Sequence, residues 1–99
     1  MAKIRRLVLD VLKPHEPSKI VLAKKLAEMK GVTGVDIALL EIDTKVQNVK
    51  VTLQGDDLDY DKIVNLIQDH GGTVHSIDKV STGTKIVDEL HTPQDRRYK

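Results

Sequence analysis

Two aspartates in otherwise apolar, strand-like segments are the residues best placed to do chemistry. Asp10 stands in the middle of IRRLVLDVL, residues 4–12, and Asp78 stands in TVHSIDKV, residues 73–80. Two carboxylates that approach each other on one sheet face repel unless a cation, a basic partner or a shared proton compensates them. Carboxylate oxygens suit hard cations such as Ca²⁺ and Mg²⁺. Asp10 and Asp78 are therefore candidate metal ligands.

The pairing of these two carboxylates depends on which way the segment 73–80 faces. Each of its two alternating sets of side chains is half polar, so the sequence leaves its facing open. If Ser76 and Asp78 share a face with Asp10, the carboxylates meet. The alternative is an ion pair with Arg5, Arg6 or Lys79, or plain solvation.

A second acidic group, Asp57, Asp59 and Asp61, has the alternate spacing with which a calcium loop begins. The rest of that pattern is missing, because Lys62 stands where the loop needs glycine and Gln68 where it needs a bidentate glutamate. Acidic residues also stabilise the first turn of a helix by capping and by the helix dipole. The group therefore predicts a helix that begins after Asp59.

The remaining reactive side chains do not form a catalytic pattern. The chain has no cysteine, so thiolate metal sites, disulfides and cysteine nucleophiles are excluded. No two of the four histidines, His15, His70, His75 and His91, have the close helical spacing of a zinc site. His75 could act as a general base, but nothing near it in sequence would orient it. We therefore expect a protein that is not an enzyme and has no resident organic cofactor.

Composition narrows the class of partner and the compartment. The 99 residues are 39% apolar and 31% charged, with a formal net charge of +1. A nucleic-acid-binding domain usually carries a basic excess on one face, so no nucleic-acid partner is expected. No apolar run approaches the roughly 18 residues of a membrane span, and the N-terminus passes into a strand without a cleavable signal. The expected location is cytoplasmic.

The order of the apolar segments predicts the architecture. Alternating and helical periodicities give strand, helix, strand, strand, helix, strand, at residues 4–12, 18–30, 35–43, 48–54, 60–70 and 73–80. This order specifies a ferredoxin-like βαββαβ two-layer α+β sandwich with an antiparallel sheet in the order 4-1-3-2 and both helices on one face. Residues 1–82 form the predicted domain, and residues 83–99 form a C-terminal tail that could serve as an interface element.

The sheet face without helices is the predicted contact surface. Its expected apolar residues are Val8, Leu12, Ala38, Leu40 and Ile42. A contiguous apolar patch of this kind usually marks an interface, so self-association is expected. The alternative is that the tail after Gly83 folds back over the same face.

Three partial resemblances to known families exclude functions, because the residues that those functions need are missing. Residues 31–72 are similar to heavy-metal-associated domains, but the loop Leu12–Pro17 has no cysteine pair. RNA-recognition domains stack bases on aromatic side chains of the central strands, and none stands at the matching positions. Acylphosphatase-like catalysis would want an arginine in the loop after the first strand, which is absent.

A fourth resemblance covers almost the whole chain. It is carried by LVLDVLKPHEP (7–17), GVTGVDI (31–37), LLEID (39–43), VTLQGDDLDYD (51–61), GGTVHSID (71–78) and TPQD (92–95). These segments are similar to a small archaeal family known only as domain-of-unknown-function family 211. The resemblance implies a ferredoxin-like fold, an archaeal cytosolic setting and ring-like oligomers, and it supplies no established activity.

Two functional hypotheses follow from the sequence. The first is a non-catalytic homo-oligomeric module that binds a divalent cation, Ca²⁺ or Mg²⁺, or a small ligand at a carboxylate cluster. The alternative is a regulatory domain that senses an amino acid or another small ligand. Such domains usually need a glycine in the first loop, where this chain has Pro14 and Pro17. The ligand, the subunit count and the pathway are not encoded in any recognisable pattern.

Overall fold

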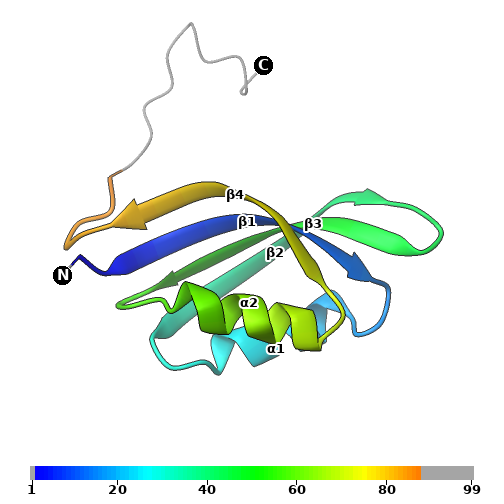
Figure 1. The fold of residues 1–99 in the computed structure, drawn as a ribbon, viewed down its shortest axis with the longest axis horizontal. Helices are drawn as coiled ribbons and strands as arrows, with labels where there is room; N and C mark the ends of the chain where they lie inside the picture. The colour runs from blue at the N-terminus through cyan, green and yellow to red at the C-terminus, as the bar shows by residue number, and fades with distance from the viewer. Residues whose placement is uncertain (1, 88–99) are drawn as a thin grey trace, which may run out of the picture.

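The computed structural model describes residues 2–87, and these form a two-layer α+β sandwich. The elements are β1 (Ile4–Pro14), α1 (Lys19–Ala27), β2 (Val32–Ile42), β3 (Val46–Gly55), α2 (Tyr60–Asp69) and β4 (Thr73–Thr82). The four strands pair antiparallel in the order β2-β3-β1-β4, and the two helices lie side by side on one face of the sheet (Figure 1). This is the predicted order 4-1-3-2 read from the other edge, and it is consistent with a ferredoxin-like fold.

The core lies between the sheet and the two helices, because the central strands alternate strictly. On β1 the odd-numbered side chains Leu7, Leu9 and Val11 are buried, and their even-numbered neighbours are only half-buried. A fully buried aliphatic side chain stabilises a fold by roughly 1.5–3 kcal/mol. The other buried apolar residues are Leu22, Leu26, Val49, Val51, Leu53, Leu58, Ile63 and Ile67. With no phenylalanine or tryptophan in the chain, these aliphatic side chains carry the packing.

Both helices begin at capping residues. The Ser18 hydroxyl accepts a hydrogen bond of 3.3 Å from the amide of Val21, so α1 starts at Lys19. Pro17 immediately precedes this cap. At α2, Asp59 caps the helix as predicted, and Leu58 and Ile63 on either side of the cap are both buried. This is the arrangement of a hydrophobic staple.

Irregular pairing on the two outer strands is the feature that strand periodicity did not predict. β2 has register shifts between Val32 and Gly34 and between Leu39 and Glu41, which make Thr33 and Leu40 extra residues opposite β3. β4 has shifts that make His75 and Asp78 extra residues opposite β1. Each such bulge interrupts the alternation of faces along its strand.

The hairpin between β2 and β3 is closed by a side chain. The Asp43 carboxylate accepts hydrogen bonds from the amides of Lys45, at 2.9 Å, and Val46, at 3.0 Å. These backbone bonds, first that of Val46 and then that of Lys45, lower the pKa of Asp43 from its ordinary value of 3.8. The His15 ring lies 2.9 Å from the Asp43 carbonyl oxygen and so ties the β1–α1 loop to this turn.

Arg5 connects the ends of three strands at the end of the sandwich opposite the β2–β3 hairpin. Its guanidinium donates to the carbonyl of Gly55, at 3.0 Å, and to those of Gly83 and Thr84, both at 3.2 Å. It also forms an ion pair of 3.9 Å with the exposed Asp56. The end of β3 and the segment that follows β4 are thereby held against the start of β1. Residues 88–99 of the expected tail lie outside the described residues, so the domain boundary after residue 82 stays a prediction.

The end of α1 packs against the end of β3 so closely that only glycine fits. A Cβ atom on Gly55 would collide with the backbone carbonyl of Gly31 and would lie 2.9 Å from Leu58. Gly31 itself has a φ of +87°, which L side chains rarely adopt. The amide of Asp56 donates to the Gly31 carbonyl at 3.1 Å, which fixes this approach.

The substitution Gly55→Ala tests this contact. We expect a loss of about 1–3 kcal/mol or more in the free energy of unfolding, because the clash is with backbone that cannot move aside. Gly34→Ala is the control, since a Cβ there has no neighbour within 4 Å. Urea denaturation that gave both variants the same stability would contradict the close approach.

Candidate functional site

The candidate carboxylate Asp10 lies at the centre of the sheet face that carries no helix. Its direct cross-strand neighbours are Lys50 on β3 and Ser76 on β4. Directly opposed residues of antiparallel strands point to the same face. The question of which β4 side chains accompany Asp10 is therefore resolved: Ser76 does.

Asp78 is linked to Ser76, and so to the vicinity of Asp10, by a hydrogen bond. The regular alternation of β4 does not place it there. It is the extra residue between Ile77, opposite Leu9, and Lys79, opposite Val8. The Ser76 hydroxyl donates to Asp78 Oδ1 at 2.7 Å. One hydroxyl thus lies opposite Asp10 and binds Asp78, which brings the two predicted residues to the same part of the open face.

Asp10 has an unsatisfied oxygen. Its Oδ1 atom is buried, and within residues 2–87 it has no hydrogen-bond partner. A buried carboxylate oxygen without a donor costs free energy, about 1–3 kcal/mol or more. A cation or a donor from another molecule would satisfy it. Asp10 and Asp78 are nevertheless two ligands at most, and no group of three or more potential metal ligands occurs in the described part of the chain.

The arginines proposed as partners for Asp10 are engaged elsewhere. Arg5 forms its ion pair with Asp56. Arg6, on the same face as Asp10, donates from Nη2 to Gln54 Oε1 at 3.3 Å.

Four of the five predicted interface residues lie on the open face. Val8 is opposite Thr52, Leu12 is opposite Asn48, and Ala38 is opposite Lys50. Leu40 is the bulged residue beside them and is half exposed.

Ile42 was placed on this face wrongly. Because the bulge at Leu40 shifts the register, Ile42 pairs with Gln47, which lies on the helix-facing side together with Lys13. Polar residues of β3, among them Lys50 and Thr52, stand on this face between the apolar residues of β1 and β2.

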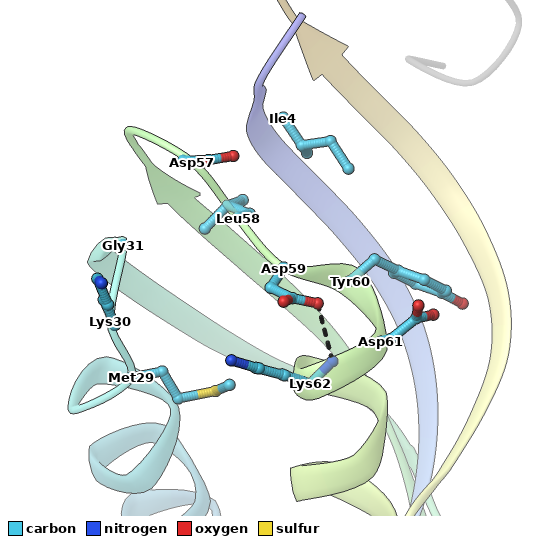
Figure 2. A pocket seen from close by; sticks show the side chains of 10 residues that line it. All are labelled: Ile4, Met29, Lys30, Gly31, Asp57, Leu58, Asp59, Tyr60, Asp61 and Lys62. Carbon is cyan, nitrogen blue, oxygen red and sulfur yellow. Dashed lines mark hydrogen bonds between the residues drawn. The ribbon is translucent and has the colours of Figure 1, made fainter. Parts of the chain in front are cut away.

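A cleft lies at the start of α2, and the sequence did not predict it (Figure 2). It has a volume of about 570 Å³ and lies between the end of α1 and the loop that leads into α2. Its lining residues are Ile4, Met29, Lys30, Gly31, Asp57, Leu58, Asp59, Tyr60, Asp61 and Lys62.

The acidic residues of the cleft do not converge on a ligand position. The Asp59 carboxylate accepts from the Lys62 amide at 3.2 Å and is committed to the cap. The Lys62 side chain extends toward Met29, while Asp61 lies on the other side, beside Tyr60 (Figure 2). This confirms the prediction that Asp59 begins a helix, and it explains why the calcium-loop spacing is incomplete.

The three described histidines are dispersed and share no role. The His15 ring contacts the hairpin, and His70 Nδ1 lies 2.8 Å from the Leu66 carbonyl in its own helix. His75 is the exposed bulge residue of β4. His91 lies outside the described residues.

A buried lysine is the polar feature that sequence reasoning missed. Lys13 is 1% exposed, on the core face of β1, and its Nζ donates to the Pro14 carbonyl at 2.6 Å. Gln47, opposite it on β3, is also buried, and its Oε1 atom has no partner within residues 2–87. Burial lowers the pKa of Lys13 from 10.5, with a further lowering from Lys19 and an opposing contribution from Glu16. The strict alternation of β1 was the available signal, since it assigns residue 13 to the face of Leu9 and Val11.

Neither helix of the described structure is long and apolar enough to cross a membrane. The fold and the open face define a two-layer α+β protein with one uncovered sheet surface and a small carboxylate–hydroxyl group on it.

The comparison with known sequences identifies the family. Residues 5–96 match the family DUF211, described as uncharacterised ArCR, and the chain belongs to this family. A relative from Methanocaldococcus jannaschii, "Uncharacterized protein MJ0319", is 52% identical over 96 residues, which cover 97% of this chain and 99% of that protein. The resemblance read from the sequence is confirmed, and an archaeal family is supported.

Lys13→Met tests the buried amine. Because the pKa of Lys13 is lowered in the folded state, the unfolded chain binds this proton more tightly, and the charged amine destabilises the fold at neutral pH. The free energy of unfolding should therefore rise with pH between the lowered pKa and 10.5, and Lys13→Met should lack this contribution.

Urea denaturation at a series of alkaline pH values measures this difference. Lys24→Met, at an exposed position of α1, is the control and should keep the wild-type pH dependence. Equal slopes for wild type and Lys13→Met would show that the Lys13 amine is not perturbed.

Proposed function

We propose that this protein is a non-catalytic, homo-oligomeric, ferredoxin-like module whose subunits meet through the open face of the sheet. The observation that carries the proposal is that both helices lie on one face and leave Val8, Leu12, Ala38 and Leu40 on the other. Apolar residues that an isolated sandwich leaves uncovered are stabilised when a second subunit removes them from water.

The second part of the proposal is cation binding at the carboxylate group on the same face. The buried, unpartnered Oδ1 atom of Asp10 supports it, together with the Asp78 carboxylate bound to Ser76. Two protein carboxylates fall short of the six to eight oxygen ligands that Ca²⁺ takes. The site therefore requires further oxygen ligands, from water or from a neighbouring subunit.

The alternative function is the sensing of an amino acid or another small ligand. The cleft of about 570 Å³ beside α2 favours it, because its volume is within the range of small-molecule sites. Against it stands the β1–α1 loop, which has prolines at positions 14 and 17 and no glycine. A thermal-shift screen with amino acids and nucleotides separates the two functions, since only the sensor should be stabilised by one of them.

Assembly is tested by light scattering of the wild-type protein at tens of micromolar. We expect a mass at least twice that of the chain, which is 11.1 kDa. Val8→Lys should lower this mass, because it places a charge among the apolar residues of the open face, whereas Asn65→Lys, at an exposed position of α2, should not. A wild-type monomer would remove the oligomeric part of the proposal.

Cation binding is tested by calorimetric titration of Ca²⁺ and Mg²⁺ into the wild type and into Asp10→Asn. We expect heat of binding for the wild type with at least one cation and a loss of affinity of tenfold or more in Asp10→Asn. Asp69→Asn, at the exposed end of α2, should bind as the wild type does. Absence of heat with both cations would remove this part and leave the assembly untouched.

A further inference from the structure

The two outer edges of the sheet differ in regularity. β2 pairs with β3 without interruption from Gly34 to Leu39, which gives six consecutive pairs. The longest uninterrupted run of β4 against β1 is three pairs, from Lys79 to Ser81, because bulges at His75 and Asp78 break the rest. Bulges are a device that prevents an edge strand from pairing with another chain. The bulges of β4, at His75 and Asp78, divide that edge into short runs, whereas the bulges of β2, at Thr33 and Leu40, lie at the two ends of one regular run of six residues.

The β2 edge also carries exposed apolar side chains. Leu39, the last residue of the regular run, is 45% exposed, and Leu40 and Ile42, at and just beyond the bulge, are 50% and 57% exposed. Asp36 is the one charged residue between Gly34 and Leu39. A regular, weakly charged edge strand with exposed apolar residues is a template for strand addition.

We propose that the outer edge of β2 pairs antiparallel with β2 of a second copy, around a two-fold axis perpendicular to the sheet. This contact joins two four-stranded sheets into one of eight strands. The inference rests on the self-association proposed above, and it adds a contact surface that is distinct from the open face.

Symmetry restricts the register of this pairing. A two-fold axis perpendicular to the sheet keeps both helical layers on one side, so opposed residues must point to the same face. Their numbers then share parity, so one residue lies opposite its own symmetry mate, and the axis passes midway between these two copies of it. An axis at Asp36 would oppose two like carboxylates, which is unfavourable. An axis at Ile37 avoids this and keeps five pairs within the regular run.

The register centred on Ile37 makes the edge self-complementary. Val35 of one copy lies opposite Leu39 of the other on the helix-facing side, where both are apolar and Leu39 is half exposed in the single chain. Asp36 lies opposite Ala38 on the open face. A self-complementary patch is what an isologous contact requires, and this is why we assign a second copy rather than an unrelated partner.

A matched pair of charge substitutions tests the edge. Leu39→Lys places a charge on the proposed contact, and Ile77→Lys places one at a similarly exposed, helix-facing position of β4. We expect the mass measured by light scattering to fall at least twofold for Leu39→Lys and to stay unchanged for Ile77→Lys. The reverse result would overturn the proposal in favour of pairing between the β4 edges of two copies.

Cysteine cross-linking tests the register without depending on a destabilising charge. The chain has no cysteine, so each introduced thiol is unique. Asp36→Cys and Ala38→Cys are prepared separately, mixed under reducing conditions that allow subunit exchange, and then oxidised. We expect a disulfide-linked dimer in the mixture in at least fivefold excess over either variant alone, because residues 36 and 38 are opposed only between copies.

The outcomes distinguish this inference from the proposed function. A wild-type monomer would overturn both. Three results together would overturn the β2 contact alone. The wild type is an oligomer, Leu39→Lys keeps the wild-type mass while Val8→Lys does not, and the mixture of the two cysteine variants gives no excess of disulfide-linked dimer.

Discussion

The strict alternation of β1 is the constraint on which the rest of the structure depends. β1 is flanked by β3 and β4 and so fixes the facing of three strands at once. Its odd-numbered residues, from Leu7 to Val11, form the centre of the core under the helices, and the even-numbered Asp10 consequently faces the other way. A register slip of one residue would exchange the two sets. The core and the carboxylate site are therefore two results of one pairing.

The same alternation explains why a buried charged side chain, which destabilises the fold, lies at the end of β1. Continuing the odd-numbered face by one step places Lys13 on the core side, with Gln47 across from it. The strand pair extends this far because the hairpin is held by Asp43 and by the contact of His15 with the turn. A buried lysine with one carbonyl partner is destabilising by itself, so the interactions that hold the hairpin must offset it.

The sequence predicted what depends on local periodicity and on capping chemistry. The element order, the sheet order and the cap at Asp59 were all predicted correctly, since each follows from spacing or from the preferences of one helix terminus. The family was also identified from the sequence. The tail beyond residue 87 and the domain boundary are not tested by the described residues.

The features that sequence missed are those set by pairing between distant strands. Bulges at Leu40, His75 and Asp78 depend on how β2 and β4 fit their neighbours, and no local pattern marks them. Ile42 was therefore assigned to the wrong face, and the facing of Ser76 was left open. The cleft beside α2 was missed for a related reason: it depends on how the glycines at positions 31 and 55 bring two loops together.

The two proposed contact surfaces are geometrically compatible. A two-fold axis perpendicular to the sheet puts the helices of both copies on one side and leaves a single continuous open face on the other. The apolar residues of each copy's open face then lie on one larger surface, together with both Asp10 groups. Burial of apolar area contributes roughly 25 cal/mol per Å², so doubling the continuous surface raises the free energy available for further assembly. Edge pairing would thereby strengthen association through the open face, and the bulges that protect β4 would limit the growth of the sheet to the β2 side.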